Sequence, residues 1–253
     1  MADKHIAVVY AAKPETEIRK TSSGRSKVVN KVLMGTWMGI TRYSRDGERA
    51  HVITAGKDGW VKLEDTKEEQ DLKIFFVDVG QGDGALIECN SKRYIVDGGP
   101  NRAIYRYLTK WQYSYALKKK EKVHIDAIFI SHFDADHYKG IIPILKDERF
   151  TVDTIYHNGI ARFATKAGSR KPSYNTDLGK VLKSSSFTKR ELDTTFNSLT
   201  DVNKLLAGGG LQTSFKRMLT AISDAAADGR VGKVKRLTAR DKNVKSMPAG
   251  LSI

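Results

Sequence analysis

The feature that most constrains this chain is a buried-type strand that runs directly into a loop rich in histidine and aspartate. Residues Val123–Ile130 are mostly apolar, and the next seven residues read Ser131-His132-Phe133-Asp134-Ala135-Asp136-His137. A helix N-cap near Asp136 accounts for one carboxylate, but not for two histidines and two aspartates within six residues. Imidazole and carboxylate are donors that Zn²⁺, Mn²⁺ and iron favour. The loop therefore predicts a metal site at the end of a strand, with four candidate ligands: His132, Asp134, Asp136 and His137.

Strand-like runs alternate with helix-like segments from Leu72 onward, and this alternation is typical of an α/β or layered α+β domain. The other predicted strands are Leu72–Val79, Ala85–Cys89, Arg93–Val96 and Thr151–Tyr156. The predicted helices are Arg102–Lys120, Tyr138–Lys146, Lys189–Leu206 and Thr213–Ala227. We interpret the three tryptophans, Trp37, Trp60 and Trp111, as packing residues. The basic segment Arg230–Lys245 carries no clear secondary-structure signal.

The first 63 residues follow a different pattern, with short strands separated by Gly and Asp-Gly turns, which suggests a small β-barrel. The predicted strands are His5–Ala11, Lys27–Leu33, Met38–Tyr43, Ala50–Ala55 and Gly59–Leu63. This region loosely resembles the bacterial SH3-like modules. The acidic run Glu64–Gln70 is interpreted as a linker. We therefore expect two domains, an SH3-like module at residues 1–68 and a second domain at residues 69–253.

Three motifs in the second domain resemble the metallo-β-lactamase-fold hydrolases. The segment His132-x-Asp134-x-Asp136-His137 is similar to the metal motif of that family, with Asp134 where most members have histidine. This replacement is found in the branch typified by the hydrolase domain of ComEC-type competence proteins. The segments Phe76-Val77-Asp78-Val79-Gly80-Gln81-Gly82-Asp83 and Ile95-Val96-Asp97-Gly98-Gly99 resemble the opening strands of the same branch. The resemblance covers residues 71–157 and implies an αββα sandwich with the site at one edge of its β-layers.

The resemblance also implies a role for each site residue. His132 and Asp134 would bind a first divalent ion, Zn or Mn, and Asp136 and His137 a second one. Asp136 would also be catalytic, because it would orient the attacking water. Asp97 would brace the metal loop, although a turn-capping aspartate before two glycines explains it equally well. Three more residues are expected to line the same edge: Asp78, Gln81 and Asp83.

The family completes its site with a later histidine, a bridging aspartate and a final histidine, but no histidine follows His157 in this chain. The resemblance therefore implies an apparently truncated, N-terminal half of the fold. We expect a C-terminal half of the same hydrolase, supplied by a split or cleaved chain, as a partner. A truncated or defective gene product and a fragment reused for binding are the alternatives.

Charge points to a polyanionic partner. The chain has a net charge of +15, and residues 158–253 alone carry 18 Lys+Arg against 7 Asp+Glu, a net +11. Phosphate neutralisation supplies most non-specific affinity for nucleic acid. We therefore expect a phosphodiesterase or nuclease acting on DNA. The alternative is a non-catalytic protein- or nucleic-acid-binding module built on the SH3-like barrel and a defective hydrolase scaffold.

The sequence also bears on location. Cys89 is the single cysteine, the N-terminus lacks the pattern of a secretory signal, and no apolar run approaches the roughly 18 residues of a membrane span. These observations predict a cytoplasmic protein without a membrane partner.

Overall fold

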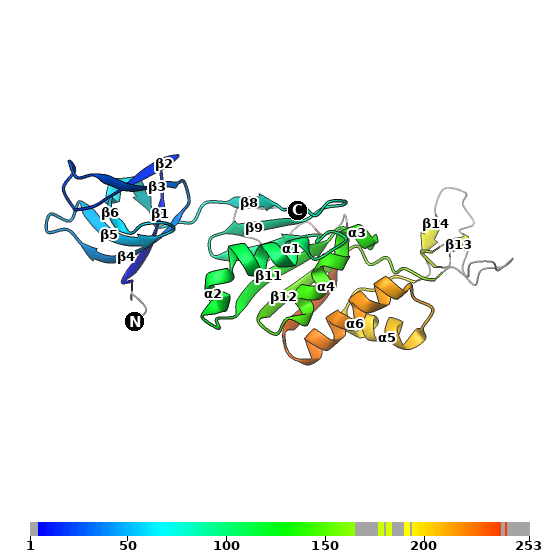
Figure 1. Cartoon of the computed structure of the whole chain (residues 1–253). Helices are drawn as coiled ribbons and strands as arrows, with labels where there is room; N and C mark the ends of the chain where they lie inside the picture. Colours follow the sequence, from blue (N-terminus) through cyan, green and yellow to red (C-terminus); the bar gives the residue numbers. More distant parts are fainter. Residues whose placement is uncertain are drawn as a thin grey trace. The chain divides into compact units, whose positions relative to one another are not determined.

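The chain folds into two compact units (Figure 1). The computed structural model describes residues 5–164, 177–179, 181–183, 190–192, 194–238 and 241. The first unit extends to Lys73 and includes Glu88–Ser91, and the second comprises Ile74–Ile87 and the chain from Lys92 onward. The fold is of the mixed α+β class, as expected. Among the described residues, no helix has both the length and the apolar character that crossing a membrane requires.

The first unit is built on a seven-stranded sheet with the strand order β3-β2-β6-β5-β4-β1-β7, whose pairings are antiparallel. The strands are β1 (Ala7–Ala11), β2 (Glu15–Arg19), β3 (Val28–Leu33), β4 (Trp37–Tyr43), β5 (Arg49–Thr54), β6 (Gly59–Lys62) and β7 (Thr66–Lys67). Alternate side chains fill its core, including Ile18, Met38 and Val52, all fully buried. The period-2 pattern of strands produces this alternation.

Two details of this unit differ from the sequence prediction. Strand β2 was not expected, because only Thr16 and Ile18 of its five residues are buried and the others are charged. The expected linker Glu64–Gln70 is partly structured instead. It enters a 3₁₀ turn, η1 (Leu63–Asp65), and strand β7, where Thr66 pairs with Ala11 and Lys67 with Tyr10 of β1.

The second unit is built on a six-stranded sheet with the order β15-β12-β11-β10-β9-β8 (Figure 1). Its strands are β8 (Lys73–Phe76), β9 (Ala85–Cys89), β10 (Lys92–Val96), β11 (Val123–Ile130), β12 (Phe150–His157) and β15 (Val231–Arg236). The pairs β10–β11, β11–β12 and β12–β15 are parallel, so the C-terminal ends of these four strands meet at one edge. Two short strands, β13 (Val181–Lys183) and β14 (Arg190–Leu192), pair with each other separately.

Helices cover one face of this sheet (Figure 1). They are α1 (Ala103–Tyr107), the π-helical turn η2 (Leu108–Gln112), α2 (Ser114–Lys118), α3 (Ala135–Tyr138), the 3₁₀ turn η3 (Lys139–Ile141), α4 (Ile142–Lys146), α5 (Leu199–Gly208) and α6 (Thr213–Ala227). Leu108, Ile144 and Phe215 of the helices share a core with Ile125 and Ile155 of the sheet. The predicted helix Lys189–Leu206 begins later than expected, because the Ser198 side chain caps α5 by accepting the backbone N–H of Asp201.

The opposite face of the sheet carries a second, smaller apolar cluster. Tyr94, Phe129 and Tyr156 are buried there, and the rings of Phe129 and Tyr156 stack with centroids 5.0 Å apart. On the edge strand β8, Ile74 and Phe76 are 47% and 86% exposed. None of the described helices contributes to this cluster.

Candidate metal centre

Three chain segments meet at the C-terminal edge of the second sheet. The loop after β11 holds Ser131–His137, the segment after β10 holds Asp97–Gly99, and the turn between β8 and β9 holds Gly80–Gly84. Gly98 donates its backbone N–H to the carbonyl of His137 at 2.6 Å, and Gly140 donates to Gly99 at 2.9 Å. These are the three segments that carry the family resemblance, and the fold brings them together.

Glycine allows the closest of these contacts. Gly82 has a φ of 77° and packs directly against the backbone of Asp136, so a Cβ at this position would clash with the Asp136 carbonyl oxygen. A side chain would also strain the left-handed backbone. The turn between β8 and β9 therefore rests on the metal loop because residue 82 is glycine.

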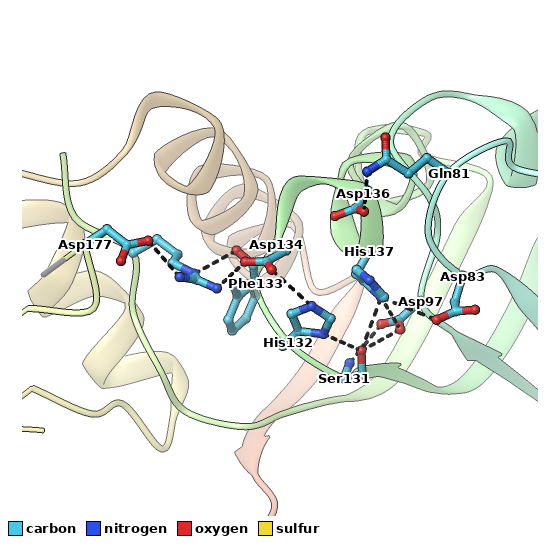
Figure 2. Close-up of polar contacts among 11 residues, drawn as sticks. Gln81, Asp83, Asp97, Ser131, His132, Phe133, Asp134, Asp136, His137 and Asp177 are labelled. Atoms are coloured by element: carbon cyan, nitrogen blue, oxygen red, sulfur yellow. Dashed lines mark hydrogen bonds and ion pairs between the residues drawn. The ribbon is translucent and has the colours of Figure 1, made fainter. Parts of the chain in front are cut away.

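Asp97 anchors the candidate metal loop Ser131–His137 (Figure 2). Its carboxylate accepts the backbone N–H of Ser131 at 2.8 Å, the Ser131 hydroxyl at 2.6 Å, and the Nδ1–H of His137 at 2.9 Å. Asp97 is 2% exposed, so these bonds offset the desolvation of its charge. Because Nδ1 of His137 donates, its Nε2 is left as the atom available to a metal.

His132 and Asp134 form a second group beside His137. The imidazoles of His132 and His137 lie 3.9 Å apart, measured between ring centroids. His132 Nε2 lies 3.3 Å from Asp134 Oδ2. Two donors in a tetrahedral zinc shell with bonds of 2.0–2.1 Å are about 3.4 Å apart, so this pair already has the spacing of neighbouring ligands.

Arg162 holds the other oxygen of Asp134. Its guanidinium forms an ion pair with Asp134 Oδ1 and another with Asp177 at 2.8 Å, and it donates to the carbonyl of Phe133 at 3.1 Å (Figure 2). The Arg162 side chain is 16% exposed. Asp134 is therefore fixed from one side while its Oδ2 faces His132.

Asp136, the predicted catalytic residue, faces the turn between β8 and β9. Gln81 donates from Nε2 to Asp136 Oδ2 at 3.1 Å (Figure 2). Asp83 Oδ2 lies 3.8 Å from His137 Nδ1. Asp78 accepts the backbone N–H of Gly80 at 3.0 Å within its own turn, and the contacts of the loop described above do not involve it.

The residues fall into one group of three, whose spacing could hold a metal although its Asp97 carboxylate already accepts the Nδ1–H of His137, and one pair. Asp83, Asp97 and His137 each offer a ligand atom within 4.8 Å of the others. His132 and Asp134 are the pair. These nitrogen and oxygen donors suit Zn²⁺ or Mn²⁺, so the donor set fits the expected ions. The grouping of His137 with Asp83 and Asp97 differs from the ligand assignment implied by the resemblance, which pairs His137 with Asp136.

A further group, His124, Asp126 and Asp153, lies on β11 and β12 away from this edge. Asp126 is 3% exposed, and it pairs with Lys92 at 2.7 Å and accepts the backbone N–H of Arg93 at 2.8 Å. Its charge is already balanced by these donors.

Two residues of the centre were not predicted. Ser131 was the first residue of the motif, but its role depends on Asp97, 34 residues earlier. Arg162 lies 28 residues after Asp134, and no local pattern connects the two. His157, the last histidine of the chain, is buried against Phe196, with ring centroids 4.1 Å apart.

Comparisons with known proteins leave the family open. No family model, curated protein or solved structure matches this chain.

Proposed function

We propose that the second unit is half of a metallo-β-lactamase-fold hydrolase of the ComEC-like branch, and that its loop Ser131–His137 binds divalent ions to hydrolyse phosphodiester bonds in DNA. One observation carries the proposal. Asp97 joins Ser131 and His137 at the end of β11, which orients an imidazole for metal binding. Capping of the turn accounts for the bonds of Asp97 to Ser131, whereas its bond to the imidazole of His137 is the one that a metal site requires.

The apolar face of the second sheet supports the half-fold interpretation. Phe129 and Tyr156 form part of its apolar cluster, and Ile74 and Phe76 are exposed on the edge strand β8 of the same sheet. In an αββα sandwich this face packs against a second β-layer. We infer that a C-terminal half, in the same or another polypeptide, covers it. The first unit fits an SH3-like barrel, because its antiparallel strands enclose a single core.

The number of ligands also favours completion of the site by a second half. The described residues offer each ion two of the expected ligands, whereas zinc sites take three or four from the protein. The second half would therefore add ligands as well as a sheet.

The chain's own residues have separate roles in this scheme. Bound divalent ions would supply an activated water and stabilise charge on the phosphoryl oxygens. Asp136 would orient the attacking water, and Gln81 would fix the Asp136 carboxylate through its 3.1 Å hydrogen bond. Asp97 would hold the ring of His137, and Arg162 would hold Asp134.

DNA is the substrate that charge favours. Lys233 and Lys235 are exposed on β15, the strand next to β12, and contribute to the excess of residues 158–253. Much of that excess lies outside the described residues. Cations near a cleavage site attract phosphates before any specific contact forms.

The experiment is metal-dependent cleavage of plasmid DNA by the chain together with the half that completes it. We expect cleavage with Mn²⁺ or Zn²⁺, a loss of at least 100-fold with Asp136→Ala, and no loss with His124→Ala as the matched control. Full activity of Asp136→Ala would contradict the proposal. A metal-free protein that binds DNA without cleaving it would favour the binding-module alternative.

A further inference from the structure

A one-residue insertion interrupts the helical segment that follows Asp97–Gly99. Tyr113 donates its backbone N–H to Leu108, five residues earlier, at 2.9 Å, which closes the π-helical turn η2 between α1 and α2. Such turns are rare and often occur at functional sites. The segment Arg102–Lys120, predicted as a single helix, therefore consists of α1 and α2 joined by a π turn.

The π turn changes which side chains face the core. Ile104 and Leu108 are buried, and an uninterrupted helix would continue this buried stripe through positions 111 and 115. Instead the stripe moves to Tyr113 and Leu117, both 7% exposed.

Two aromatic side chains consequently face solvent. Trp111 is 78% exposed and Tyr115 is 70% exposed, one helical turn apart. The interpretation of Trp111 as a packing residue is therefore wrong. Two large exposed rings one turn apart offer apolar and aromatic surface to a ligand.

The sequence around these rings is rich in basic residues. Residues 106–122 contain Arg106, Lys110, Lys118, Lys119, Lys120 and Lys122 against the single acid Glu121. All of these side chains are exposed. Lys119 Nζ lies 4.2 Å from the Tyr115 ring centroid, and its hydrogen bond to Tyr115 raises the pKa of Lys119 above its ordinary value. The ammonium therefore remains charged at neutral pH.

We propose that Trp111, Tyr115 and the neighbouring lysines form a binding surface for single-stranded nucleic acid. Exposed rings offer stacking to unpaired bases, and lysines follow the phosphates, which is how sequence-tolerant single-strand binding works. A membrane surface fits less well, because interfacial helices bury a continuous apolar face and the aliphatic residues here, Leu108 and Leu117, are in the core.

The surface is separate from the metal centre. It lies on the helical segment before β11, whereas the metal loop follows β11, and none of the contacts described for the metal loop involves Trp111 or Tyr115. The inference rests on the proposed function in one respect, the choice of nucleic acid as the anionic ligand. Binding at this surface needs no metal. A DNA strand held at this surface would be retained while another part of it reaches the metal loop.

The test is fluorescence anisotropy of a labelled 20-nucleotide oligo-dT with the full chain in EDTA. We expect Trp111→Ala to raise Kd by about 5- to 100-fold, the effect of losing one stacked base. Trp111→Phe should stay within about threefold of wild type, because it keeps a ring. Tyr43→Ala removes a half-exposed aromatic of the first unit and should have no effect.

Charge is tested independently of the rings. The triple variant Lys118→Gln, Lys119→Gln, Lys120→Gln should reduce the slope of log Kd against log salt by about 2, since each phosphate contact on a single strand contributes about 0.7. The Asp136→Ala variant should bind like wild type, which separates this surface from the proposed catalysis.

Three results would overturn the inference. The first is that the wild-type chain does not bind the oligonucleotide. The second is that wild type and Trp111→Ala have equal Kd and the triple variant has an unchanged salt slope, and the third is tighter binding to anionic vesicles that Trp111→Ala loses while it keeps oligonucleotide binding.

Discussion

The carboxylate of Asp97 accepts a hydrogen bond from the imidazole of His137 at 2.9 Å across 40 residues of sequence. The same carboxylate holds Ser131 at the start of the loop. One buried acid therefore fixes both ends of the candidate metal loop.

Asp97→Asn should weaken metal binding with little change in fold. The asparagine oxygen can still accept the Ser131 N–H, but the amide nitrogen cannot accept the His137 Nδ1–H. Losing such an outer partner typically lowers metal affinity 10- to 100-fold. Competition with a chelator of known affinity measures the change, and an unchanged zinc affinity would mean that Asp97 only shapes the turn.

Gly82→Ala should destabilise the second unit far more than Gly80→Ala. Both glycines have positive φ, 77° and 85°, so each substitution strains the backbone by about 1 kcal/mol. Only at Gly82 would the new Cβ clash with Asp136, whereas Gly80 has open space. We expect a total loss above about 3 kcal/mol for Gly82→Ala, measured by urea unfolding. Equal losses for the two variants would show that the turn between β8 and β9 does not rest on the loop.

Burial and the nearby Arg236 lower the pKa of His157 to about 4. The unfolded chain then binds more protons than the folded one between pH 6.5 and pH 4, so stability falls as pH falls through this range. The loss between pH 7 and pH 5 is about 2 kcal/mol.

His157→Asn should flatten that pH dependence. Asparagine does not titrate, and its side-chain oxygen can replace Nδ1 as the acceptor of the Gly159 N–H, a bond of 2.9 Å in the structure. Thermal unfolding at pH 7 and pH 5 gives the comparison. The same slope in wild type and variant would assign the pH dependence to other groups.

Much of the fold could be predicted because the alternation of apolar residues and the turn residues mark most strands. The prediction failed where charged residues or tertiary packing obscure those signals. Strand β15 was missed because Lys233, Lys235 and Arg236 conceal Val231 and Val234, which alone face the helices. The π turn was missed because the insertion depends on how Tyr113 and Leu117 pack, which no local pattern records.

The candidate site was predictable to a different extent. The motif residues are local in sequence, so His132–His137 could be singled out directly. The ion pair between Arg162 and Asp134 joins residues that only the folded chain brings together. The resemblance pairs Asp136 with His137, but in the structure Asp136 faces Gln81 and Asp83 lies near His137. This arrangement also depends on how the turn between β8 and β9 packs, which no local pattern predicts.

The most direct test of the account is the metal content of the purified full chain. After dialysis against Zn²⁺ or Mn²⁺, elemental analysis should find close to one ion per chain or more. The double variant Asp136→Ala, His137→Ala should lose at least one ion. The control variant His124→Ala changes a histidine on β11, away from the loop, and should retain the wild-type metal content. A wild-type chain that is stably folded and free of metal, or a double variant that binds as much as wild type, would contradict the assignment of Ser131–His137 as a metal centre.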